Sequence, residues 1–160
     1  MIVVADSGPL HYLILLDLTE LLQRFYGQVV VPEAVATELL SPSAPLIVRE
    51  WISRAPSWVN VIPVESEQIQ VVTDHLDLGE RSALALAAAL HADLLLIDEA
   101  AGRAEAKRRN LRVMGTLGVL RTGAELGLIN VRDLLARLKM TSFHVDEAVV
   151  ESVFAQWLKP

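Results

Sequence analysis

The sequence predicts an α/β fold with three layers, α/β/α, around a central and mostly parallel sheet. Short apolar runs alternate with longer segments of helical periodicity over residues 2–126. Two of these runs, 2–5 and 94–97, are apolar throughout, as buried parallel strands are. The chain has 160 residues, which suits one domain that buries a substantial core.

The first part of the chain predicts three strands and four helices. The run 2–5 contains two valines and ends at Asp6-Ser7-Gly8-Pro9, which breaks a strand. Pro32 stands where the first turn of a helix accepts proline, and Ser41-Pro42-Ser43-Ala44-Pro45 is the clearest loop. In order, we expect a strand at 2–5, helices at 10–16 and 18–25, a strand at 28–31, helices at 32–40 and 47–53, and a strand at 58–62.

The second part continues the alternation and ends in helices. The segment 79–91 is rich in Ala and Leu and predicts a strong helix. In order, we expect helices at 66–75 and 79–91, a strand at 94–97, a helix at 99–109, a short strand at 112–114, and helices at 116–126, 131–140 and 146–158. We expect one domain over residues 1–140, with residues 141–160 as a helical extension packed on it. The alternative for this extension is a contact with a partner.

Composition excludes several classes of site. The chain has no cysteine, which rules out disulfides, thiolate nucleophiles and zinc or iron–sulfur sites with cysteine ligands. The N-terminus lacks a basic segment before its apolar run, and no apolar run is long enough to cross a bilayer. We therefore expect a cytoplasmic protein that makes no membrane contact.

The net charge of −6 argues weakly against general nucleic-acid binding, because phosphate contacts need Lys and Arg. The basic residues are nevertheless clustered, so a polyanionic substrate remains compatible with the sequence. The candidates for RNA backbone contacts are Arg103, Lys107, Arg108, Arg109 and Arg112. The alternative for each is a solvated helix end that the helix dipole favours.

Two acidic residues directly follow predicted strands. Asp6 comes after the strand at 2–5, and Asp98 comes after the strand at 94–97. In an open parallel sheet, ligands bind beyond the carboxyl ends of the strands. Each acid also precedes a predicted helix, so the competing interpretation is an N-cap whose oxygen accepts from helix N–H groups.

Two further acidic residues lie on helices that should face the core. Glu80 shares one apolar helix face with Leu84 and Ala87, although its spacing from Asp77 is also that of a capping box. Glu38 lies between Val35 and Leu39 in a turn that we expect to face the core. Buried carboxylates are costly unless they are paired.

Taken together, these four carboxylates favour a cation. Like charges held close together repel, and a hard divalent ion such as Mg²⁺ or Mn²⁺ removes that repulsion with oxygen ligands. The histidines, His11, His75, His91 and His144, are scattered and form no zinc-binding spacing. Glu99 offers an ion pair with Arg103 at i,i+4 spacing as an alternative to a role in the site.

At these residues the chain resembles the PIN-domain family, and in particular the VapC-type toxin ribonucleases and their largely uncharacterised relatives. The similarity spans residues 2–120, about three quarters of the chain. The segments that carry it come in the family's order and are IVVADSGPL, VVVPEAVATELL, LGERSALALAAAL, LLLIDEAAGR and LRVMGTLGVL.

The resemblance implies that Asp6, Glu38, Glu80 and Asp98 form an acidic pocket that binds Mg²⁺ or Mn²⁺. It implies hydrolysis of single-stranded RNA, a toxin role, an antitoxin protein as partner, and a homodimer. Auxiliary residues are expected at Ser7, which matches a small hydroxyl residue of the family, and at Glu99 and Thr116.

The chain departs from the family pattern at two positions. Leu96 stands where many PIN domains carry Thr, and Ala100 where many carry a further Asp; Glu99 offers a replacement charge. These departures put the metal count and the catalytic rate in doubt. They favour an alternative function, a catalytically weak or inactive module that binds RNA or a partner protein.

A third class, an enzyme that binds nucleotides on a doubly wound sheet, lacks its sequence signatures. Neither G-x-x-x-x-G-K-[ST] nor G-x-G-x-x-G after a strand is present.

Overall fold

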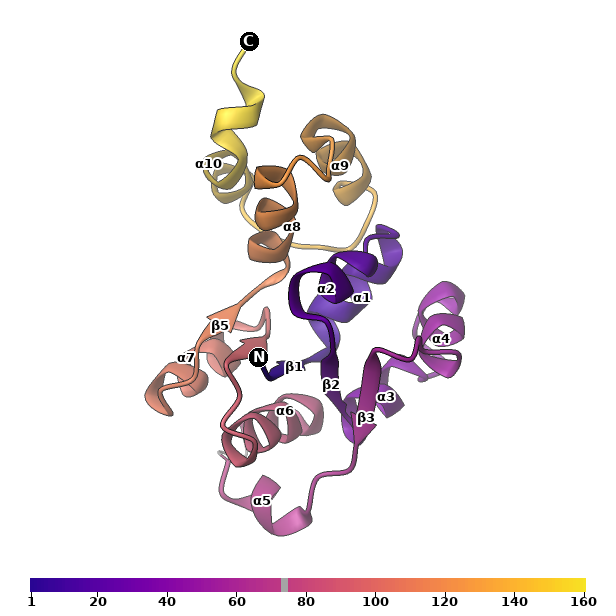
Figure 1. The fold of residues 1–160 in the computed structure, drawn as a ribbon, viewed down its shortest axis with the longest axis vertical. Coiled ribbons are helices and arrows are strands. Elements are labelled where there is room, and N and C mark those ends of the chain that lie inside the picture. Colours follow the sequence, from indigo (N-terminus) through magenta and orange to yellow (C-terminus); the bar gives the residue numbers. More distant parts are fainter. Residues whose placement is uncertain (73–74) are drawn as a thin grey trace.

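The central sheet of the computed structural model, which describes residues 1–72 and 75–160, is entirely parallel. Its strands are arranged in the order β3-β2-β1-β4-β5 (Figure 1). Register pairs Ala5 with Leu96, so β1 and β4 end side by side. The strands are β1 (Val3–Ala5), β2 (Val29–Pro32), β3 (Val59–Ile62), β4 (Leu94–Leu96) and β5 (Val113–Met114). The predicted three-layer α/β/α class is confirmed.

The helices follow the predicted order with small shifts at their ends. They are α1 (Ser7–Leu15), α2 (Glu20–Tyr26), α3 (Glu33–Leu39), α4 (Leu46–Ser53), α5 (Ser66–Gln70), α6 (Leu78–Ala89), α7 (Ala100–Arg108), α8 (Thr116–Glu125), α9 (Val131–Leu138) and α10 (Glu147–Leu158). The helix predicted at 66–75 ends early, at Gln70, and is followed by a turn at Val71. Residues 73 and 74 of that prediction lie outside the described residues.

Two hydrophobic cores cover the two faces of the sheet, because side chains alternate along each strand. Val3 and Ala5 of β1 face the larger core, to which helices α1, α3, α4, α8 and α9 contribute. Val4 faces the smaller core, beneath α6 and α7. Figure 1 shows α6 and α5 together at one side of the strands and α1 and α2 at the other.

The C-terminal helices form one end of the molecule, with the C-terminus beyond α10 (Figure 1). Helix α10 contacts α8 and α9, and its Phe154 is completely buried in the larger core. Helical geometry is interrupted at that residue, where φ is −108° and ψ is 15°.

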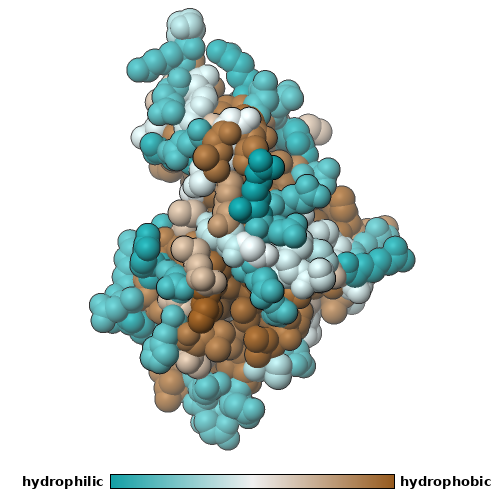
Figure 2. Space-filling model, in the orientation of Figure 1, coloured by the Kyte–Doolittle hydropathy of each residue, from teal (hydrophilic) through white to brown (hydrophobic). Residues whose placement is uncertain are grey.

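Apolar residues also reach the surface near the N-terminus. On the face shown in Figure 2, hydrophobic residues are exposed around the N-terminus and hydrophilic residues cover the periphery; Met1 is 74% exposed. Within residues 1–72 and 75–160, no helix combines the length and the apolar character that crossing a membrane requires.

The burial of Phe154 gives a test of the proposal that residues 141–160 fold as part of the same domain. We expect Phe154→Ala to lower the free energy of unfolding by about 3–5 kcal/mol, because it leaves a cavity in the larger core. Val149→Ala, on the exposed side of the same helix, should change it by less than about 0.5 kcal/mol. Urea unfolding measures both. Equal, small effects would show that the last helix is not part of the cooperative unit.

Candidate active site

Asp6 lies at the carboxyl end of the central strand β1. Its backbone N–H donates to the carbonyl of Leu96 (2.9 Å), which continues the pairing of β1 with β4 by one residue. The residue occupies the N-cap position of α1 but makes no capping hydrogen bond with its side chain. The capping interpretation of Asp6 is therefore wrong, and its carboxylate remains available for another role.

The Asp6 side chain is buried without a hydrogen bond on one oxygen. The residue is 5% exposed, and Oδ1 has no partner among the described residues. Burial is the main reason why the pKa of Asp6 rises to about 7; the Ser7 backbone N–H opposes this rise, and the charges of Glu38, Asp77 and Asp98 add to it. Two of those three residues belong to the four carboxylates that the sequence singled out.

Asp98 binds the beginning of a different helix from the one predicted. The expectation that it caps the following helix is wrong, because α7 begins at Ala100 and its N-cap position is occupied by Glu99. Instead, the Thr116 backbone N–H donates to Oδ1 (2.7 Å) and the Thr116 hydroxyl donates to Oδ2 (2.6 Å). Thr116 is the first residue of α8 and is completely buried. The carboxylate is thus fixed by a positively polarised helix end.

Glu80 lies in the first turn of α6, beside Asp77. The Asp77 side chain accepts from the Glu80 backbone N–H (2.8 Å), so the capping relation between the two residues is confirmed. The pKa of Glu80 is raised to about 8, chiefly by burial, with further contributions from the hydrogen bond and charge of Asp77 and from the charges of Asp6 and Glu99. Glu80, at the capped end of α6, is therefore within the electrostatic reach of Asp6.

The turn that contains Glu38 faces the core through Val35 and Leu39, as predicted, but the Glu38 side chain itself is exposed, which corrects the expectation that it is buried. It lies in the last turn of α3, and its Oε1 is 3.0 Å from the position that a Cβ atom on Gly79 would occupy. Its charge acts on Asp6. The reason for the error is that Val35 and Leu39 bury the adjacent side of the helix, and Glu38 projects instead toward the beginning of α6.

Glycines allow the backbone to approach these carboxylates closely. A Cβ on Gly8 would lie 3.2 Å from Asp98 Oδ2, and one on Gly115 would lie 2.7 Å from Asp98 Oδ1. The same Cβ position on Gly115 is 2.8 Å from Nη1 of Arg103, so a side chain there would displace Asp98 or the Arg103 guanidinium. The space around the carboxylates depends on residues without side chains.

The donor set fits a hard divalent cation. All four side chains offer carboxylate oxygens, and Asp6 Oδ1 is a buried acceptor without a partner. In the described part of the chain, no three His, Asp or Glu side chains are already arranged around one point as metal ligands. The neighbouring carboxylates contribute to the raised pKa values of Asp6 and Glu80, and a bound cation would oppose this repulsion.

The auxiliary residues differ in their surroundings. Ser7 is half-buried next to Asp6, and Glu99 is exposed but contributes its charge to the environment of Glu80. The guanidinium of Arg103 donates to the carbonyl of Ile97 (3.2 Å), at the end of β4, and lies close to Asp98. Arg103 is thus the member of the basic cluster that the fold brings to the carboxylates.

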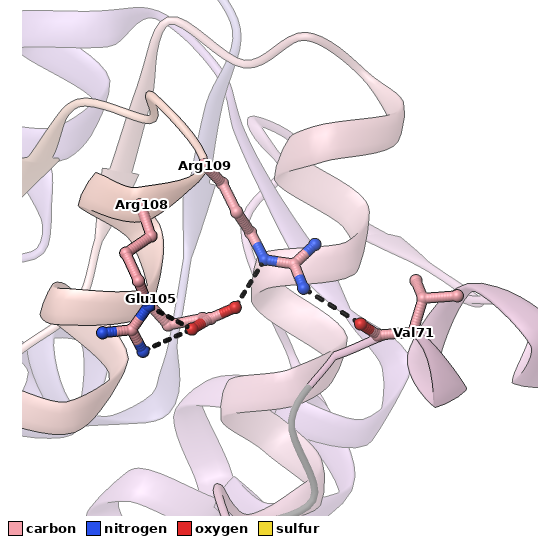
Figure 3. A network of polar contacts seen from close by, with 4 residues as sticks. All are labelled: Val71, Glu105, Arg108 and Arg109. Carbon is pink, nitrogen blue, oxygen red and sulfur yellow. Dashed lines mark hydrogen bonds and ion pairs between the residues drawn. The ribbon is translucent and has the colours of Figure 1, made fainter.

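Two of the predicted RNA contacts are occupied within the protein. Arg108 and Arg109 both bind the carboxylate of Glu105, and Arg109 also donates to the carbonyl of Val71 (3.0 Å), as Figure 3 shows. Lys107 and Arg112 are exposed. Arg108 pairs with Glu105 within α7 and its side chain is 61% exposed, whereas Arg109 connects the end of α7 to another segment.

Two residues of this region were not expected from the sequence. Asp77 was interpreted only as a cap, yet its charge acts on both Asp6 and Glu80. Its spacing of three residues before Glu80 was the available signal. Glu105 is a nearly buried acid that anchors two arginines, and its i,i+3 and i,i+4 spacing to them was likewise visible.

Comparison with protein families gives one finding for the whole chain. A family model described as a PIN domain matches residues 2–159. A search of the curated proteins finds no match.

The raised pKa of Asp6 predicts a pH-dependent cost. Between about pH 4 and pH 7 the folded state binds a proton that the unfolded state has lost, so stability falls as pH rises through this range. In EDTA, Asp6→Asn should therefore raise the free energy of unfolding on the order of 3 kcal/mol at about pH 8 and change it little near pH 4. Urea titrations across pH measure this difference. Asp17→Asn, at an exposed position, should leave the parent's profile unchanged, and a D6N profile that parallels the parent's would contradict the assignment.

The hydroxyl of Thr116 offers a second test, because it bonds directly to Asp98. Thr116→Val keeps the shape of the side chain and removes one charge-assisted hydrogen bond, so we expect a loss of about 1.5–3 kcal/mol in the free energy of unfolding. The matched control is Thr122→Val on the same helix, whose hydroxyl bonds only to the carbonyl of Gly118. Equal losses in the two variants would argue against a special role for Asp98.

Proposed function

The chain belongs to the PIN-domain family, whose members are typically nucleases, and we propose that it is a metal-dependent endoribonuclease that cleaves single-stranded RNA. The observation that carries this proposal is the buried, unpartnered oxygen of Asp6 at the end of the central strand, within the electrostatic reach of Glu38 and Asp98. A fold does not by itself determine activity, so the argument depends on this site.

Four residues would hold the ion, Mg²⁺ or Mn²⁺: Asp6, Glu80 and Asp98, with Glu38 at the exposed side of the cluster. When bound, such an ion lowers the pKa of a coordinated water and neutralises the charge of the attacked phosphate. Asp98 is already oriented for this role by Thr116, because both of its oxygens are fixed by hydrogen bonds.

The side chains of the site can also handle the proton of the attacking water. Glu38 or Glu80 would accept that proton. Glu38 is exposed and can pass it to solvent, whereas Glu80, whose pKa is raised to about 8, must first lose its own proton. Attack by water on phosphorus forms one P–O bond and breaks the bond to the 3′ oxygen. The products would be a 5′-phosphate and a 3′-hydroxyl, and no nucleophilic side chain is required.

The structure provides a counterpart for one departure from the family pattern. Leu96 is completely buried in the larger core and offers no hydroxyl to the site. The hydroxyl of Thr116 contacts Asp98 from α8 instead. The alternative function, an inactive module that binds RNA or a protein, is favoured only by Ala100, an exposed position that carries no acid.

The biological setting proposed here follows from the family resemblance. We place the enzyme in the cytoplasm as the toxin of a toxin–antitoxin pair, with an antitoxin protein as partner and a homodimer as its assembly. The candidates for contacts to the RNA backbone are Arg103, Lys107, Arg108, Arg109 and Arg112. Lys107, Arg108 and Arg112 are exposed, and Arg109 is the one that is held both by Glu105 and by the carbonyl of Val71.

Calorimetric titration with Mn²⁺ tests the metal site directly. We expect the parent protein to bind Mn²⁺ and the Asp6→Asn/Asp98→Asn variant to lose at least about tenfold in affinity, because two of its oxygen ligands lose their charge. Affinity of the parent should increase from about pH 6 to pH 8, as the raised pKa values of Asp6 and Glu80 require the loss of protons on binding.

The same proteins are then compared for cleavage of single-stranded RNA with Mn²⁺ or Mg²⁺. Asp17→Asn serves as a control with the same chemical change at an exposed position, and circular dichroism verifies that each variant is folded. If parent and double variant bind Mn²⁺ alike, the metal site is absent. If the parent binds Mn²⁺ and RNA but does not cut, the alternative of a binding module is favoured.

A further inference from the structure

A hollow of about 420 Å³ lined by Asp17 and Arg24 lies elsewhere on the molecule. A second hollow is lined by Glu38 and by Ser7 and Gly8, which directly follow Asp6. This second hollow, here called the α1 hollow, has a volume of about 340 Å³. Its lining includes Ser7, Gly8, His11, Tyr12, Glu38 and Ser142. That volume is at the lower end of the range for small-molecule sites, which suits a single nucleotide.

Helix α1 connects the α1 hollow to the carboxylates. Gly8 lies in the first turn, where a Cβ atom would be 3.2 Å from Asp98 Oδ2. His11 and Tyr12 follow three and four residues later, on the same side and about one turn, or 5.4 Å, further along the helix. A substrate whose phosphate lies at Asp98 would therefore have its next group above His11 and Tyr12.

The two aromatic residues differ in how firmly they are held. The Tyr12 ring packs edge-to-face on Phe143 at a centroid distance of 4.8 Å, and its hydroxyl is 3.3 Å from the hydroxyl of Ser142. Tyr12 thus joins α1 to the segment before α10. His11 is half-buried, and among the aromatic residues described it contacts Tyr12 alone, in a T-shaped arrangement at a centroid distance of 4.8 Å.

The charges of the α1 hollow favour a base rather than a phosphate. Glu38 is the charged residue in its lining, and it lies at the carboxylate end; Lys and Arg are absent from the described lining. The remaining lining offers aromatic rings and the hydroxyls of Ser43 and Ser142. Burial lowers the pKa of His11, so its ring is neutral at neutral pH and suited to stacking. Aromatic side chains bind unpaired bases by stacking, and hydroxyls can bond to base edges.

We propose that the α1 hollow binds one unpaired nucleobase of the RNA, next to the phosphate that is cut, with His11 as the stacking residue. This inference rests on the proposed function and adds to it the part of the substrate that the carboxylates cannot recognise. It also gives a reason for a single-stranded substrate, because a base paired in a duplex cannot enter the hollow.

The test combines a protein change with a substrate change. Fluorescence anisotropy measures binding of a short, labelled single-stranded RNA of mixed sequence in Ca²⁺, and the same RNA is prepared with one base removed at each position in turn. We expect His11→Ala to weaken binding of the intact RNA at least about fivefold, the effect of losing one stacked base. Removal of the base at one position should weaken binding to the parent equally and binding to His11→Ala no further.

Two variants control for structural effects. His11→Phe keeps a flat ring and should restore binding to within about twofold of the parent, because stacking tolerates the exchange of one ring for another. His91→Asn changes an exposed histidine whose φ is +50°, a conformation that Asn adopts readily, and it should bind RNA like the parent. Thermal unfolding of each variant separates a loss of binding from a loss of structure.

The outcomes distinguish this inference from the proposed function. If RNA is bound or cut but His11→Ala binds it like the parent, or the two losses multiply, the hollow does not hold a base and the inference is overturned. If His11→Ala binds RNA like the parent, binding of a protein partner becomes the alternative role of the α1 hollow. If the folded parent neither binds nor cuts RNA, the proposed function fails, and the inference fails with it.

Discussion

The structure around the candidate site depends on one unfavourable interaction, the burial of the Asp6 carboxyl group at the end of the central strand. Its side chain has an oxygen without a partner, and the charges nearest to it are also negative. Such a group costs stability unless it is protonated or meets a cation. Folded proteins keep destabilising ionisable groups of this kind mainly at functional sites. The carboxylate cluster is therefore the feature of the molecule that says most about its function.

The surrounding residues keep this cluster open and oriented. Glycines at positions 8, 79 and 115 leave space beside Asp98 and Glu38 that a side chain would fill. Thr116 fixes Asp98, and Asp77 fixes the beginning of α6, where Glu80 lies. The carboxylates therefore come from four different parts of the chain, and Asp98 is fixed by a helix that begins 18 residues after it.

On the neighbouring helix α7, a carboxylate and two arginines form ion pairs. Glu105 holds Arg108 and Arg109, and Arg109 reaches the carbonyl of Val71, so α7 is attached to the segment that leads toward α6. The burial of this acid is tolerated because the hydrogen bonds and charges of two guanidinium groups stabilise the ionised carboxylate, which also lowers its pKa. The fold thus connects one residue of a basic cluster, Arg109, to a distant segment, which composition does not reveal.

The sequence by itself determined the order and kind of the strands and helices, because hydrophobic periodicity is local and each element is short and distinct. It also singled out four acids as the candidate site, since carboxylates at the ends of apolar segments are unusual. Only the tertiary structure decided that Asp98 binds α8 rather than α7, that Glu38 is exposed, and that Asp77 shares the cluster. These features arise between segments far apart in the chain, where the packing of helices on both faces of the sheet decides which side chains meet.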